Sequence, residues 1–264
     1  MKTVLFSILI LGVLGALFGA MLAVSSKVFH VETDPKQQAV RACLGGANCG
    51  GCGYPGCDGY AAAVAAGKAP ANKCVAAGPE ASAKIAEIMG VSNVASEKKV
   101  AFVPCSGCDG AAQKRFEYAG PKDCRAAMLF GGKSNKDCTF ACIGFGNCVN
   151  ECRFGAMSIV NGVAVVDREK CVGCGSCADA CPKSIIRMIS DQQHVSVACS
   201  NKDKGARTIK ICSAGCIGCG KCARECPADA IEVVDNLAVI HPEKCVGCGH
   251  CSEICPRKVI TWHP

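Results

Sequence analysis

We predict an α+β chain of small domains, each organised around its own set of cysteine ligands, behind one N-terminal transmembrane helix. Three observations lead to this fold class. The 264-residue sequence contains 26 cysteines, residues 138–181 and 212–255 repeat each other at an offset of 74 positions, and residues 4–24 carry no charge. Leu, Ile and Phe are sparse after residue 25. We therefore expect bound inorganic groups to replace much of the apolar core, as structural metals do in small domains.

The spacing of the cysteines favours metal ligation over a disulfide scaffold. Disulfide frameworks are typical of short secreted domains, whereas C-x2-C pairs repeated along a longer chain indicate metal binding. The formal charge of +7 treats every thiol as neutral, although a metal-bound cysteine is a thiolate. The charge therefore does not predict nucleic-acid binding, and we expect none.

Residues 1–25 are predicted to form a transmembrane anchor. The apolar stretch 4–24 has 21 residues, enough to span about 31 Å at the rise of an α-helix. A cleaved signal peptide is the alternative, but its apolar region is normally shorter, about 7 to 15 residues. A stripe of small residues would let another membrane helix pack closely: Gly12, Ala16, Gly19, Ala20 and Ala23.

A four-cysteine domain is predicted over residues 43–91, after a polar linker at 26–42. Its ligands have the spacing C-x2-C-x4-C-x16-C: Cys49, Cys52, Cys57 and Cys74. Glycines between the first ligands and the turn at "YPG" allow the backbone to wrap around a cluster. Zinc also accepts four cysteines, so the spacing favours an iron–sulfur cluster without excluding zinc. Short helices are expected at 60–67 and 79–91.

The repeat predicts two tandem modules, at residues 138–190 and 212–264, joined by connectors at 92–137 and 191–211. Bacterial ferredoxins that hold two clusters have the run C-x2-C-x2-C-x3-C, in which the fourth cysteine binds the other cluster. Each module contains two such runs around "SIVNGVAVVD" or "EVVDNLAVIH", and both stretches are typical of a β-hairpin. Three ligand sets follow from this rule: Cys171, Cys174, Cys177 and Cys152; Cys216, Cys219, Cys222 and Cys255; Cys245, Cys248, Cys251 and Cys226.

One run departs from the pattern, because Phe145 occupies the place of its second cysteine and Arg153 replaces the proline that follows the other runs. We expect Cys138 to supply the missing bond, so that Cys138, Cys142, Cys148 and Cys181 hold this cluster. Alternatively, Cys142, Cys148 and Cys181 would hold a three-iron centre, and Cys138 would be a remnant or would ligate elsewhere.

Five [4Fe–4S] clusters are therefore expected, and a sixth is a further option. Its candidate ligands are Cys105, Cys108, Cys124, Cys199 and Cys212, besides Cys138. The competing interpretation is that these cysteines are buried thiols without a ligand, as expected for Cys43.

The apolar helix, the motif "ANCGGCGYPGC" with Cys74, and the tandem modules together resemble the B subunits of Rnf ion-translocating electron-transport complexes, over nearly the whole chain. The resemblance implies an electron-transfer subunit of a translocase, with soluble ferredoxin and other membrane subunits as partners. It implies a single-pass protein of the cell inner membrane. We expect the cluster domains to face the cytoplasm, since free thiolate ligands persist in a reducing compartment.

The residues themselves favour an electron carrier over an enzyme with its own substrate. The sequence has no Gly-rich dinucleotide fingerprint after a strand and no phosphate-binding loop. Two other functions compete with the first: the iron–sulfur subunit of another membrane-anchored oxidoreductase, such as a molybdenum enzyme, and a cluster-based redox sensor. The "YPG" domain argues against the former, and the lack of an output module argues against the latter.

Overall fold

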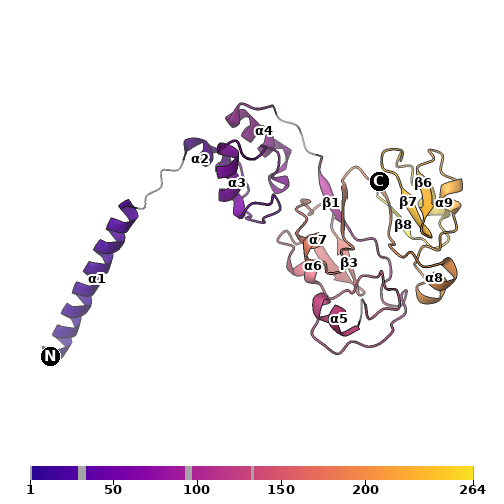
Figure 1. The fold of residues 1–264 in the computed structure, drawn as a ribbon, viewed down its shortest axis with the longest axis horizontal. Helices are drawn as coiled ribbons and strands as arrows, with labels where there is room; N and C mark the ends of the chain where they lie inside the picture. Colours follow the sequence, from indigo (N-terminus) through magenta and orange to yellow (C-terminus); the bar gives the residue numbers. More distant parts are fainter. Residues whose placement is uncertain (1, 29–33, 93–96, 132–133, 264) are drawn as a thin grey trace.

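The computed structural model describes residues 2–28, 34–92, 97–131 and 134–263 and has mixed helix and strand content. Its first element is the helix α1 (Lys2–Val28), which lies apart from the cysteine-rich domains (Figure 1). Residues Ile8–Lys27 of this helix are long and apolar enough to cross a membrane, and none of that segment is buried against the rest of the chain. The expected apolar helix is thus present. His30 and part of the expected linker lie outside the described residues.

The four-cysteine domain is helical. Helices α2 (Pro35–Ala42), α3 (Gly56–Ala65) and α4 (Gly78–Met89) pack around Tyr60, Val64 and Ile85, with the short helix η1 (Val75–Ala77) between α3 and α4. Pro35 at the start of α2 and Pro79 in the first turn of α4 suit positions whose amide has no partner within the helix. The hydroxyl of the buried Tyr60 donates to the carbonyl of Pro70 at 2.7 Å. Both helices expected from the sequence are present.

The first ferredoxin-like module contains two small antiparallel sheets. Strands β2 (Met157–Val160) and β3 (Val163–Val166) form the expected hairpin. Its turn residues, Asn161 and Gly162, have φ of 46° and 74°, as a tight hairpin turn requires. Strand β1 (Lys99–Phe102) pairs with β4 (Arg187–Ser190). The connector before the module therefore supplies the module's first strand.

The second module repeats this architecture. Strands β6 (Ile231–Val234) and β7 (Leu237–Ile240) form its hairpin, and β5 (Val195–Val197) pairs with β8 (Ile260–Trp262). Apolar residues of the strands pack against cysteines in each module, with Val100 and Val163 in the first and Val195 and Leu237 in the second.

The two modules are joined by main-chain pairing. The amide of Gln113 donates to the carbonyl of Ile211 at 2.9 Å, and the amide of Ser213 donates to the carbonyl of Ala111 at 2.8 Å. Helix α5 (Cys124–Gly131) belongs to the connector before the first module, and α8 (Gly205–Ile211) to the connector before the second. Figure 1 shows the first module between the four-cysteine domain and the second module.

Candidate iron–sulfur sites

Short helices position one cysteine of each ferredoxin-type run. Each helix begins directly after a glycine with φ between 69° and 87°, a conformation that glycine adopts without a steric penalty. A second glycine of positive φ lies two positions earlier, so the loop can bend around a bound group. The helices are α6 (Asn147–Asn150), α7 (Ser176–Ala180), α9 (Lys221–Arg224) and α10 (His250–Ile254), and they carry Cys148, Cys177, Cys222 and Cys251.

The second module contains two cavities, each lined by one complete set of four cysteines. The cavity that we call site 2A is lined by Cys216, Cys219, Cys222 and Cys255. The cavity called site 2B is lined by Cys226, Cys245, Cys248 and Cys251. These are the two sets that the sharing rule assigns to this module. Burial raises the pKa of Cys251 to about 11, and the neighbouring thiols of Cys222, Cys245 and Cys248 contribute to this rise.

Site 1A is the corresponding group of Cys152, Cys171, Cys174 and Cys177 in the first module. Burial, followed by the thiols of the other three cysteines, raises the pKa of Cys177 to about 11. Main-chain amides point at the sulfurs: Ala101 N donates to Cys171 Sγ at 3.4 Å, and Ala156 N donates to Cys152 Sγ at 3.3 Å. Hydrogen bonds of this kind tune the reduction potential of a bound cluster.

The N-terminal site consists of Cys49, Cys52, Cys57 and Cys74. Burial, and then the neighbouring thiols of Cys52, Cys57 and Cys49, raise the pKa of Cys74. The side chain of Asn48 fixes the loop, because its Oδ1 accepts a hydrogen bond from Cys57 N at 2.7 Å. The structure therefore brings together all four cysteines of this motif.

The remaining site of the first module differs from the expectation. We call it site 1B: a cavity lined by Cys124, Cys142, Cys148 and Cys181. The fourth cysteine is therefore Cys124, whereas Cys138 lines a separate cavity. Burial raises the pKa of Cys148 to about 12, and the thiols of Cys142, Cys124, Cys181 and Cys177 contribute to this rise.

Cys124 is held at this cavity by hydrogen bonds that begin at Asn147. Asn147 Oδ1 accepts from Cys124 N at 2.7 Å, while Asn147 Nδ2 donates to Asp123 Oδ2 at 2.7 Å. The amide of Ala126 and the side chain of Asn147 lower the pKa of Asp123 by donating to its carboxylate. Phe145 packs on Tyr118 with 5.2 Å between ring centroids, in the apolar cluster that contains Cys124. The aromatic ring thus packs beside the segment that supplies the fourth thiol.

Cys138 lies with three cysteines to which the sequence alone assigns no definite role. Cys105, Cys138, Cys199 and Cys212 line one cavity between the two modules. We call this group the bridge site. Of the remaining cysteines, Cys43 Sγ donates to the carbonyl of Ala39 at 3.4 Å, and Cys108 packs against the core of the first module.

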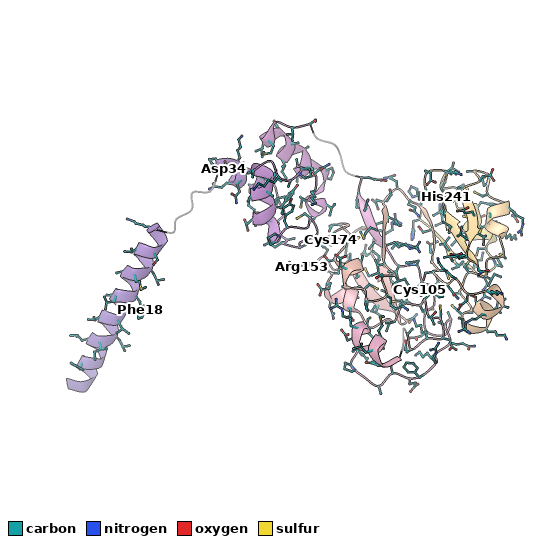
Figure 2. All side chains as sticks on the ribbon, viewed as in Figure 1. Phe18, Asp34, Cys105, Arg153, Cys174 and His241 are labelled. Carbon is teal, nitrogen blue, oxygen red and sulfur yellow. The ribbon has the colours of Figure 1, made fainter. Side chains whose placement is uncertain are left out.

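The domains also touch at their cysteine loops. A Cβ added to Gly51 would lie 2.7 Å from the carbonyl oxygen and 2.8 Å from the Cβ of Cys174. Nearby, Arg153 Nη1 donates to the carbonyls of Ala47 and Asn48 at 3.2 and 2.7 Å. Arg153 and Cys174 lie on the edge of the first module that faces the four-cysteine domain, and Cys105 lies between the modules (Figure 2). The N-terminal site and site 1A are therefore neighbours.

The chemistry of these residues fits iron–sulfur clusters. Every set consists of four sulfur donors. Within the described part of the chain, no three or more His, Cys, Asp or Glu side chains are arranged to hold a single metal ion. Four cysteine thiolates are the ligand set that a [4Fe–4S] cluster takes.

Family models match the cysteine-rich regions. The model described as "Putative Fe-S cluster" matches residues 44–76. Models described as "4Fe-4S dicluster domain" match residues 136–186, 170–230 and 215–259. Fold, sulfur-lined sites and family models thus define an iron–sulfur protein that carries [4Fe–4S] clusters.

Named relatives specify the family. The chain is 42% identical to the B subunit of an ion-translocating oxidoreductase complex from Methanosarcina acetivorans, over 90% of each chain. It is 40% identical to the B subunit of a proton-translocating ferredoxin:NAD(+) oxidoreductase complex from Clostridium ljungdahlii, over 91% of this chain and 85% of the relative. The Na(+)-translocating counterpart of Acetobacterium woodii is 45% identical over 78% of this chain, and the match spans 62% of that longer relative. This chain belongs to the family of B subunits of ion-translocating (Rnf) oxidoreductase complexes.

Proposed function

We propose that this chain relays electrons between soluble ferredoxin and the other subunits of a membrane-bound ion-translocating oxidoreductase. The chain would act as a carrier, with no substrate chemistry of its own. Five [4Fe–4S] clusters would be bound at the N-terminal site and at sites 1A, 1B, 2A and 2B. In site 1B, Cys124 takes the role that the sequence alone suggested for Cys138.

The contact of neighbouring cysteine sets carries this proposal. Gly51 of the N-terminal site lies against Cys174 of site 1A. Within the modules, Cys177 of site 1A lies close enough to Cys148 of site 1B to raise its pKa, and Cys222 of site 2A acts in the same way on Cys251 of site 2B. Redox centres that lie next to one another can pass electrons from one to the next.

The two ends of the series of cluster sites suggest which partners the chain has. Helix α1 would anchor the N-terminal end in the cell inner membrane, with the cluster domains in the cytoplasm, where thiolate ligands stay reduced. At the other end, Cys219 of site 2A and Cys248 of site 2B are exposed. A cluster at an exposed cysteine can exchange electrons with a soluble carrier, so ferredoxin would dock on the second module.

Purification of the full-length chain in mild detergent under anaerobic conditions tests the proposal. We expect integral-membrane subunits to copurify, and reduced ferredoxin to bleach the visible absorbance of the clusters. A chain that begins at residue 34 should still be reduced by ferredoxin but lose the membrane partners. Stoichiometric zinc in place of iron would refute the cluster assignment. Copurification with a molybdenum enzyme, or with no membrane protein, would refute the assigned complex.

A further inference from the structure

Four cysteines meet between the two modules at the bridge site. Cys138 and Cys212 are equivalent by the repeat, since they lie 74 positions apart. Cys105 and Cys199 each follow the first strand of a module, in "VPCS" and "VACS". Each module therefore contributes the same two positions to one cavity.

The bridge cavity resembles the other sulfur-lined cavities. Like site 2B, it is lined by four cysteine thiols. A Cβ added to Gly107 would stand 3.6 Å from both Cys105 Sγ and Cys212 Sγ. These two sulfurs therefore lie beside the same glycine, with the Cβ of Ala112 at 3.3 Å from the added atom.

Main-chain amides connect this cavity to both neighbouring sites. Cys142 N, from site 1B, donates to Cys105 Sγ at 3.4 Å. Cys216 N, from site 2A, donates to Cys199 Sγ at 3.4 Å. The two hydrogen bonds are equivalent under the repeat, because Cys142 and Cys216 also lie 74 positions apart. The cavity thus lies directly between one site of each module.

Positive charge is buried beside the cavity. Lys136 is only 2% exposed, and its Nζ donates to the carbonyls of Gly107 and Gly162 at 2.8 Å each. No carboxylate within the described residues forms an ion pair with it. A buried ammonium group is costly unless a compensating negative charge lies nearby. Arg257 Nη2 also donates to the carbonyl of Cys212 at 2.6 Å. Burial raises the pKa of Cys142 at site 1B, and the charge of Lys136 opposes this rise. Burial also raises the pKa of Cys212, and the charge of Arg257 opposes it. Arg257 thus favours an anionic group in the bridge cavity, and Lys136 lies between this cavity and site 1B.

We infer that Cys105, Cys138, Cys199 and Cys212 bind a sixth [4Fe–4S] cluster, which carries electrons between the two modules. Four thiolates and a cluster core have the net negative charge that Lys136 and Arg257 would offset. Each transfer moves one electron: the centre in site 1B or 2A is oxidised as the bridge centre is reduced, or the reverse, and no bond is made or broken. This inference rests on the proposed function, since the electron comes from the same ferredoxin.

The cluster count of the full-length chain tests the inference. Native mass spectrometry, iron analysis and acid-labile sulfide analysis should find six clusters, or about 24 iron atoms per chain at four per cluster. The double substitution Cys105→Ala and Cys199→Ala should remove about four iron atoms and one paramagnetic signal of the reduced protein. The control Cys108→Ala changes a cysteine of the same loop that does not line the cavity, and it should retain all six clusters.

The outcomes separate this inference from the proposed function. Five clusters in the unaltered chain, with an unchanged count in the double variant, would overturn the bridge cluster and leave the proposed function intact. Fewer than five clusters, or zinc, would overturn both. If the double variant misfolds and loses several clusters, the count of the unaltered chain still decides between five and six.

Discussion

Arg153 donates a hydrogen bond to the carbonyl oxygen of Asn48 at 2.7 Å, and this bond joins the first ferredoxin-like module to the four-cysteine domain. The other three runs have proline at the equivalent position: Pro182, Pro227 and Pro256. Proline has no donor to offer. The departure at Arg153 therefore has a structural role, because it brings the N-terminal site against site 1A.

We expect Gly51→Ala to separate these two domains. The added methyl group would lie 2.7 Å from the carbonyl oxygen of Cys174, which forces the loops apart. Electron transfer between the N-terminal site and site 1A should slow, as measured by stopped-flow absorbance after reduction with ferredoxin, while the iron content stays constant. Gly45→Ala is the matched control, since nothing lies within 4 Å of its added Cβ. Equal rates in both variants would contradict the contact.

Arg153→Ala should weaken the same contact without a steric clash. Loss of a charge-assisted hydrogen bond in a partly exposed place costs about 1 kcal/mol, which shifts the docked fraction about fivefold. Limited proteolysis between the two domains should become faster by a similar factor. Arg187→Ala, an exposed arginine of strand β4 that forms no ion pair within the described residues, serves as the control. Unchanged proteolysis would show that Arg153 does not hold the domains together.

Substitution of Cys124 should damage site 1B. We expect Cys124→Ala to remove about four iron atoms or to convert the centre to a three-iron form, because three thiolates remain. Adding Phe145→Cys should restore the cluster, since this change recreates the usual run. Electron paramagnetic resonance and iron analysis would measure both. Cys43→Ala is the control. If every four-iron signal survives Cys124→Ala, Cys124 is not a ligand of site 1B.

Lys136 should raise the reduction potential of a cluster beside it, at site 1B or at the bridge site, because its charge acts on Cys142 and its Nζ contacts Gly107. Reduction adds negative charge, and a buried ammonium group stabilises it. We therefore expect Lys136→Met to lower one midpoint potential by about 60 mV, equivalent to a tenfold change in the one-electron equilibrium. A redox titration followed by electron paramagnetic resonance would detect the shift. Lys114→Met is the control, because Lys114 is half exposed and paired with Asp109 at 3.2 Å.

The basic segment 201–210 should assist ferredoxin docking. Lys202 pairs with Asp235 at 3.0 Å and Arg207 with Asp203 at 3.2 Å, whereas Lys204 and Lys210 are exposed and form no ion pair within the described residues. Reversing the last two, in Lys204→Glu and Lys210→Glu, should slow reduction by an acidic ferredoxin at low salt and flatten the dependence on ionic strength. Lys84→Glu, on the four-cysteine domain, should have no effect. Identical rates at low salt would exclude this docking surface.

The sequence could predict features that depend on local spacing. The hairpins at Asn161–Gly162 and Asp235–Asn236 were predictable from the sequence. Each of these residue pairs is typical of a two-residue turn, and each lies between two short stretches that are typical of strands. The grouping of Cys216, Cys219 and Cys222 with Cys255 followed from the rule of shared ligands. Each of these predictions uses a pattern that the repeat shows twice.

Features that depend on folding between distant segments were not predictable in this way. In the sequence, Cys138 is nearer to Cys142 than Cys124 is. Proximity in the sequence therefore favoured Cys138 as the fourth ligand, but Cys138 lines the bridge cavity. In the folded chain, Cys124 lines site 1B in place of Cys138, because the side chain of Asn147 holds Cys124 there. The bridge site combines segments from both modules, and Cys105 has no counterpart at the repeat offset of 74. The likeness of "VPCS" and "VACS" suggests that Cys105 and Cys199 are equivalent, and the pairing of β1 with β4 and of β5 with β8 places both directly after the first strand of a module.

The bridge cavity also constrains the order of maturation. Its ligands extend from Cys105 to Cys212, so a ribosome must synthesise most of the chain before the fourth thiol emerges. The N-terminal site, by contrast, has all its ligands by Cys74. During synthesis, Cys105 and Cys138 therefore wait as free thiols after the first domain is ready for its cofactor. A reducing compartment, as the proposed orientation would provide, keeps these two thiols available for a cluster until the second module has been made.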